Sequence, residues 1–186
     1  LMGYAFKSED FVENGIQLIR MGNLYQGDLK LERTPVFLPI RYREEYSNFL
    51  VKPGDILMSM TGTIGKRDYG FVIQTPKNCP DLLLNQRVLK IIPRKNCVKE
   101  FILQLMKDDF FLEKLYFLAG GTKQANLSVN HLNSIEVSFP SVNEQLKIAS
   151  FLSSLDEIIK AQTEVIEQLK LHKKGLMQRL LPETID

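Results

Sequence analysis

Short apolar runs alternate with glycine, proline and asparagine up to Pro140, and a single helical pattern fills most of the chain beyond it. Several of the runs are bounded by turn signals such as Pro53-Gly54 and Pro93, a pattern that predicts strands. The predicted strands are Ile16–Arg20, Asp55–Met60, Phe71–Gln74, Arg87–Ile92 and Ile135–Phe139.

The pattern turns helical between Val98 and Leu118, where apolar residues recur at helical spacing. Asp108-Asp109 predicts a break between two helices, and Gly120-Gly121 predicts the end of the second one. Residues 1–140 are therefore expected to form a globular domain of mixed α and β structure, which makes the fold class α+β.

A long helix is predicted for residues 141–182. Ser141 and Glu144 have the spacing of a capping box, in which each side chain accepts a hydrogen bond from the other residue's backbone N–H. Pro182 is expected to end the helix. The helix would be about 54 Å long at 1.5 Å per residue, which is too long for a small domain to bury.

Apolar residues follow a seven-residue repeat along this helix, which is typical of a coiled coil. The alternatives are a helix packed along its own domain or one lying on a membrane surface, and interleaved lysines and glutamates disfavour the second. The periodic positions begin with Gln145, and the expected dimerisation seam comprises Ile148, Leu152, Leu155, Ile159, Gln162, Ile166, Leu169, Leu176 and Leu180, with Lys173 also in phase.

Composition fits a soluble globular protein, with 44% hydrophobic and 25% charged residues among 186. Neither a signal peptide nor an apolar run of about 18 residues is visible, so we expect a cytoplasmic protein without membrane contact. Cys79 and Cys97 lack metal-ligand spacing, and His131 and His172 lie far apart, so no metal site is expected. The net charge of +2 comes from a mild basic excess in residues 1–140, which many unrelated domains share.

A first candidate binding segment follows the predicted strand Asp55–Met60. Hydroxyl groups, accessible backbone N–H groups and cations gather there and suit phosphate oxygens. The alternative is an ordinary β-turn, and the spacing does not fit a phosphate-binding P-loop. The candidate residues are Thr61, Gly62, Thr63, Lys66 and Arg67.

A second polar segment spans residues 120–128. Lys123 could neutralise a phosphate, and Gln124 or Asn126 could contact an adenine edge. Ser128 could equally cap a short helix that runs toward Leu132. Gln86 is a further candidate for base contacts.

Enzymatic signatures are missing from the sequence. It lacks the Asn/Asp-Pro-Pro-aromatic motif of adenine methyltransferases, and Asp28-Leu-Lys30 lacks the partner acid of a nuclease motif. No metalloprotease or nucleophile-elbow motif occurs either. We therefore expect a chain without a catalytic site or a cofactor of its own.

An ordered set of segments resembles the specificity subunits of type I restriction–modification systems. Each segment is modest alone, but together they span nearly the whole chain in the family's order. They are Ala5–Phe11, Ile19–Gly22, Lys52–Leu57 with Thr61–Gly65, Leu84–Arg87, Gly120–Thr122 with Gln124 and Asn126–Ser128, and Pro140–Gln145 leading into the coiled coil.

The resemblance implies a target-recognition domain that reads one half of a split site in double-stranded DNA, and a helix that spaces two such domains. It also implies modification subunits that bind S-adenosylmethionine and methylate adenine, and restriction subunits that use ATP and Mg. Two recognition domains are usual in the family, so this chain is expected to be a natural half-size subunit or a fragment.

Two other functions stay open: a coiled-coil module for protein interaction, and the detached recognition part of a fused restriction–modification enzyme. For assembly, we expect an antiparallel homodimer or a pair with a second specificity half. Gln162 lies near the middle of the seam and would meet its symmetry mate in a fully overlapped pair.

Overall fold

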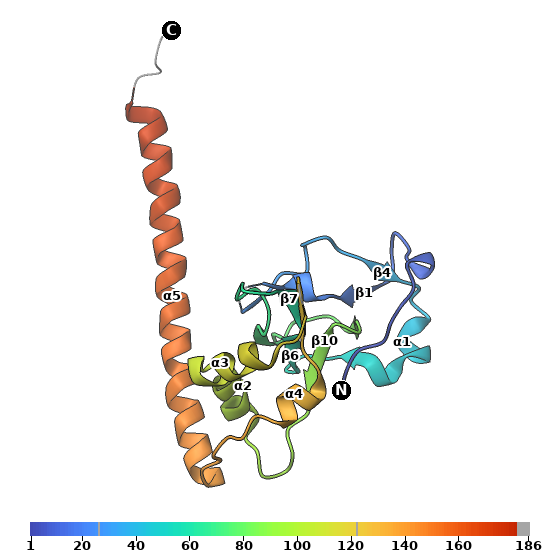
Figure 1. Ribbon diagram of the computed structural model, residues 1–186. Helices are drawn as coiled ribbons and strands as arrows, with labels where there is room; N and C mark the ends of the chain where they lie inside the picture. The colour runs from blue at the N-terminus through green and yellow to red at the C-terminus, as the bar shows by residue number, and fades with distance from the viewer. Residues whose placement is uncertain (26, 122, 182–186) are drawn as a thin grey trace.

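The protein combines short strands, short helices and one long C-terminal helix (Figure 1). The structure is a computed structural model that describes residues 1–25, 27–121 and 123–181. The expected fold class, α+β with a long terminal helix, is confirmed. No helix within the described ranges has both the length and the apolar character that crossing a bilayer requires.

The strands form two sheets and two small ribbons. The four-stranded sheet has the order β4-β1-β9-β5, in which β1 runs antiparallel to β4 and parallel to β9. Its members are β1 (Ile16–Ile19), β4 (Phe37–Leu38), β5 (Leu50–Val51) and β9 (Leu82–Leu84).

The second sheet is antiparallel and has the order β10-β6-β8, so β6 is central. It comprises β6 (Ile56–Ser59), β8 (Val72–Gln74) and β10 (Val88–Ile91). The two ribbons pair β2 (Leu24–Tyr25) with β3 (Asp28–Leu29), and β7 (Thr61–Thr63) with β11 (Gln124–Asn126).

The helices lie mainly after the sheets in the sequence. They are α1 (Tyr42–Glu45), α2 (Lys99–Lys107), α3 (Asp109–Leu118), α4 (Val129–Asn133) and α5 (Val142–Leu180), with the short 3-10 turns η1 (Ser8–Asp10), η2 (Met21–Asn23) and η3 (Ser47–Phe49). The predicted break at Asp108 is confirmed, because the Asp108 carboxylate accepts hydrogen bonds from the backbone N–H groups of Phe110 and Phe111 and so caps α3.

The core is layered because side chains alternate across β6. Ile56 and Met58 point into a cluster shared with α2, α3 and α4, whereas Leu57 points into a cluster shared with the four-stranded sheet. A third cluster on the other face of that sheet includes Leu18 and Leu38. All four residues of β6 are buried, so this strand lies between two apolar layers and fixes where the chain emerges after Ser59.

Four of the five predicted strands are confirmed, with ends that shift by one residue, as β1, β6, β8 and β10. The prediction of a strand at Ile135–Phe139 is wrong, because the segment pairs with no strand within the described chain. Ile135 is instead buried in the helical cluster, and the Phe139 ring meets Phe101 edge-on at 5.9 Å. The apolar alternation there reflects packing against helices.

The start of α5 matches the predicted capping box. The backbone N–H of Glu144 donates to the Ser141 hydroxyl (3.4 Å), and the backbone N–H of Ser141 donates to the Glu144 carboxylate (2.9 Å). These bonds lower the pKa of Glu144 against a small opposing effect of burial. Pro182, which was predicted to end the helix, lies outside the described residues, so the domain bounds 1–140 and 141–182 stay a prediction.

Gln145, the first of the periodic positions, is buried against the protein's own globular part. Its amide accepts a hydrogen bond from the backbone N–H of Val98 (2.8 Å) and donates to the carbonyl oxygens of Asn96 (3.3 Å) and Pro140 (2.9 Å). The first turns of α5 therefore pack on α2, as the alternative of a helix along its own domain expected, and the seam open to a partner begins at Ile148.

Beyond these turns α5 runs free of the globular part (Figure 1). Leu152 is half-buried, whereas Ile159 and Leu169 are each 62% exposed. The other seam positions with large exposed apolar side chains are Ile148, Leu155, Ile166, Leu176 and Leu180. A solvent-facing apolar stripe of this length indicates a contact surface.

Candidate nucleic-acid interface

The two polar segments singled out in the sequence meet in one ribbon. β7 and β11 pair antiparallel, with Thr61 opposite Asn126 and Thr63 opposite Gln124. The backbone N–H of Ile64 also donates to the carbonyl oxygen of Lys123 (3.1 Å), which brings the two segments together at the tip of the ribbon. A small two-stranded ribbon thus brings together candidates that lie about sixty positions apart in the sequence.

Met60 anchors the root of this ribbon. Its backbone N–H donates to the carbonyl oxygen of Arg87 (3.0 Å), and its own carbonyl oxygen accepts from the N–H of Leu127 (2.8 Å). Met60 is fully buried and follows directly on the central strand β6. The buried sheet therefore sets where the ribbon leaves the globular part.

Thr61, Gly62 and Thr63 mainly make contacts within the protein that hold the ribbon and its turn in place. Thr61 is buried, and its hydroxyl lies 2.7 Å from the Met21 sulfur of η2. A Cβ on Gly62 would come within 2.5 Å of Asp68 Oδ1, so any side chain there would displace the turn. Hydroxyls that the sequence offered as phosphate ligands are in part occupied inside the protein.

Asp68 holds the turn after β7 by binding Thr63 twice. The Thr63 backbone N–H donates to Asp68 Oδ1 (2.7 Å), and the Thr63 hydroxyl donates to Asp68 Oδ2 (2.8 Å). Partial burial would raise the pKa of Asp68, but these hydrogen bonds and the nearby Lys66 ammonium lower it overall. The charged Asp68 carboxylate thus holds the turn closed through its contacts with Thr63.

Three cations lie at or beside the tip. Lys66 and Lys123 are exposed, and neither ammonium forms an ion pair with any residue that the structure describes. Arg67 differs, because its guanidinium pairs with the Glu113 carboxylate of α3. The free lysines give the tip a positive face that suits an anionic backbone.

The base-reading candidates occupy different parts of this region. Gln124 and Asn126 lie on β11 with exposed side chains, although the Asn126 amide also donates to the carbonyl oxygen of Gln124 (3.3 Å). Gln86 is exposed on the turn between β9 and β10, where its backbone N–H donates to the carbonyl oxygen of Tyr4 (3.0 Å). It neighbours Arg87 at the ribbon's root rather than its tip.

Two exposed arginines at the root were missed by sequence reasoning. Arg87 binds Met60 through its carbonyl oxygen, and Arg20 directly precedes Met21, which contacts Thr61. Both residues lie inside segments that carried the family resemblance, but nothing in the sequence showed that these segments border the ribbon. Two further exposed cationic residues therefore lie next to backbone that borders the root of the ribbon.

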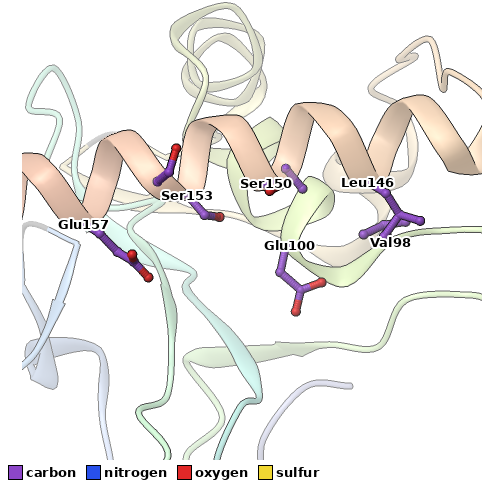
Figure 2. Close-up of a pocket in the computed structure, with 8 residues that line it drawn as sticks. Val98, Glu100, Leu146, Ser150, Ser153 and Glu157 are labelled. Atoms are coloured by element: carbon purple, nitrogen blue, oxygen red, sulfur yellow. The ribbon is translucent and has the colours of Figure 1, made fainter.

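A separate groove lies between the start of α2 and α5 (Figure 2). Four of the six α5 residues that line it stand two positions before a seam residue, about 200° around the helix, whereas Ala149 and Ser154 are direct neighbours of seam residues. Its lining residues are Val98, Glu100, Leu146, Ala149, Ser150, Ser153, Ser154 and Glu157.

Potential metal ligands are scattered in the described structure. Among the residues that the structure describes, no three histidine, cysteine, aspartate or glutamate side chains gather as a metal site would require. Cys79 is buried and Cys97 half-buried, both as free thiols.

A family model and the curated relatives of this chain point to the same protein family. The model of the type I restriction modification DNA specificity domain matches residues 2–171. The MjaVIII specificity subunit of Methanocaldococcus jannaschii, a type I restriction enzyme subunit, is 30% identical over 96% of this chain and 42% of its own length. The EcoAI specificity subunit of Escherichia coli is 26% identical over 94% of this chain and 29% of its own length.

Solved structures share the fold. A chain from a structure of a type I R-M system aligns with a TM-score of 0.63 at 16% identity, covering 96% of this chain and 41% of that one. The type I restriction-modification S subunit from M. genitalium aligns with a TM-score of 0.61 at 19% identity, covering 97% and 42%. The chain thus spans about two fifths of these longer relatives.

Proposed function

This chain belongs to the family of type I restriction modification DNA specificity domains, and on that premise we propose that it recognises one half of a split site in double-stranded DNA. The observation that carries the proposal is the β7–β11 ribbon, where two distant polar segments meet and where Lys66 and Lys123, one from each segment, are both exposed. A two-stranded ribbon fits the width of the DNA major groove.

In this proposal the cations and the amides have different tasks. Lys66, Arg67 and Lys123 contact phosphates, which positions the domain without reading sequence. Gln124 and Asn126 project from the same ribbon and contact base edges, with Gln86 beside its root. Arg20 and Arg87 extend the positive face. A coiled-coil module for protein interaction alone is disfavoured by the family match over residues 2–171.

Catalysis belongs to partner subunits in this proposal. Modification subunits supply S-adenosylmethionine chemistry, and restriction subunits supply ATP and Mg-dependent cleavage, whereas this chain acts as a non-catalytic specificity subunit. The open seam of α5 pairs with a second copy in antiparallel orientation, or with a second specificity half, and this places one recognition domain at each end.

Duplex binding by the full chain tests the proposal. Lys66→Ala and Lys123→Ala should each weaken binding to all duplexes alike and reduce the slope of log affinity against log salt by about one. Lys77→Ala is the matched control, because this exposed lysine follows Gln74, which pairs with Ile56 at the far end of β6 from Met60. Equal behaviour of all three variants would place the binding face elsewhere.

A further inference from the structure

Arg67 and Glu113 form an ion pair that links the turn after β7 to α3. The Arg67 guanidinium also lies over the Tyr116 ring, with 5.5 Å between its central carbon and the ring centroid. Glu113 and Tyr116 are three positions apart on α3, so one helix face supplies both the carboxylate and the aromatic surface. Arg67 thus has two intramolecular partners, whereas the ammonium of the neighbouring Lys66 forms no ion pair among the described residues.

The helix that carries Glu113 is held firmly against the turn. Leu115 is fully buried in the helical cluster, and the Tyr116 hydroxyl donates to the carbonyl oxygen of Tyr69 (3.2 Å). The rings of Tyr69 and Tyr116 meet edge-on at 5.1 Å. Because α3 and residues 69–70 are packed as one unit, the Glu113 carboxylate stays within reach of Arg67.

The pair itself remains open to solvent. The side chains of Arg67 and Glu113 are 64% and 56% exposed, so water and salt screen their attraction. A guanidinium in such a pair can exchange the carboxylate for a phosphate, to which it can donate two parallel hydrogen bonds. The contact is therefore weak enough for a phosphate to replace it.

We propose that Glu113 is an internal competitor for DNA: it holds Arg67 in the free protein and must release the guanidinium when Arg67 contacts a phosphate. This inference rests on the proposed function, since it concerns how the same ribbon binds. Glu113 thereby lowers the affinity for every duplex, because each binding event breaks the internal pair and leaves a carboxylate beside the DNA backbone.

Glu113→Gln tests the competition, because glutamine keeps the shape and removes the charge. It should raise duplex affinity by about twofold to fivefold, the range expected for an exposed pair, and steepen the salt slope by up to about one. In an Arg67→Ala background the same substitution should have a clearly smaller effect, because only the repulsion between the carboxylate and the DNA backbone is then removed, so a double-mutant cycle isolates the pair.

Glu136→Gln is the matched control. Glu136 is exposed and lines the same surface depression as Glu113, but it forms no ion pair within the described chain. If Glu136→Gln raises affinity as much as Glu113→Gln, the effect is general electrostatics and the competition is refuted. If Glu113→Gln weakens binding as Arg67→Ala does, the pair is a structural tether and the inference is equally overturned.

The two proposals fail separately. Duplex binding by the native chain with unchanged affinity of Glu113→Gln would refute only the competition. Absence of duplex binding by the native chain would refute the proposed function and the inference with it. Thermal unfolding of each variant checks that the fold is retained.

Discussion

Among single residues, Asp68 has the largest part in holding the turn at the tip of the ribbon. Its two carboxylate oxygens are both used by Thr63, and the turn that follows carries Lys66 and Arg67. A carboxylate beside a DNA-binding surface repels the DNA backbone, but Asp68 also holds the turn in shape. Its removal therefore strengthens duplex binding if repulsion dominates and weakens it if the shape of the turn dominates.

We predict that Asp68→Asn weakens duplex binding although it removes a negative charge. Asparagine offers one acceptor where two are needed, so the Thr63 hydroxyl or N–H loses its partner and the turn opens. Fluorescence anisotropy with labelled duplexes measures the change. Thr63→Val should weaken binding in the same direction without altering charge, and tighter binding by Asp68→Asn would contradict the role in shape.

The capping carboxylate of Glu144 makes stability depend on pH. Hydrogen bonds from Ser141 depress the folded-state pKa of Glu144 below its ordinary value of 4.5. The unfolded chain therefore binds this proton first, and the contribution of the cap is present above pH 4.5 and lost as pH falls through the folded pKa. We predict that the stability difference between the native chain and Glu144→Gln shrinks between pH 6 and roughly pH 3, measured by urea unfolding. A pH-independent difference would contradict this.

Single-residue roles were only partly predictable. Lys66 and Lys123 were recognised as candidate phosphate ligands because each lies in a short polar, glycine-containing segment. Their proximity depends on the pairing of β7 with β11, and the partner of Arg67 lies 46 positions away. Pairings over such separations are set by tertiary packing, which local patterns do not encode.

At the scale of elements, α5 shows where periodicity is informative and where it misleads. The capping box placed its first turn correctly, because hydrogen bonding between Ser141 and Glu144 is local. The seven-residue repeat begins at Gln145, yet this residue contacts its own domain, because a repeat gives the phase of a helix face and does not identify what packs on it. Likewise, Ile135–Phe139 alternates between apolar and polar residues like a strand, but the segment pairs with no sheet in the described structure.

We predict that Gln145→Leu destabilises the fold by about 1–3 kcal/mol. The substitution leaves the N–H of Val98 and the carbonyl oxygens of Asn96 and Pro140 without their side-chain partner in a buried position. Urea unfolding measures the loss. Gln168→Leu, at an exposed position of α5, is the control and should be near neutral. If Gln145→Leu stabilises the fold instead, the three hydrogen bonds are not needed and the position favours an apolar residue.

At the scale of the whole molecule, the globular part covers only the beginning of α5 and leaves its apolar stripe open. With Gln145 taken up by the protein's own domain, the remaining seam runs from Ile148 to Leu180 and its centre falls at Glu164. Gln162 lies two positions away. In the proposed antiparallel pair it still occupies the middle, where a polar side chain favours one register at a cost in stability.

We predict that the chain is a dimer at tens of micromolar and that Gln162→Leu raises its thermal stability while loosening the register. Sedimentation gives the assembly state, and cysteine cross-linking gives the orientation. Antiparallel packing should join position 152 to the region around Lys173 of a second copy. A monomer at that concentration, or cross-links between two copies of position 152, would refute the arrangement.

As far as the structure describes the chain, helix α5 is attached to the globular part only near its beginning, so a small rotation there moves its far end by a large distance. Asp156, which accepts hydrogen bonds from Gln104 (2.8 Å) and Lys107 (3.4 Å), is its last hydrogen-bonded tie to that part among the described residues. From Glu157 to Leu180 the free arm is roughly 36 Å long. A tilt of about 10° at the fulcrum would swing the far end by about 6 Å, close to two base-pair steps of about 3.4 Å. Small adjustments at α2 would therefore be magnified at the distant end of the arm.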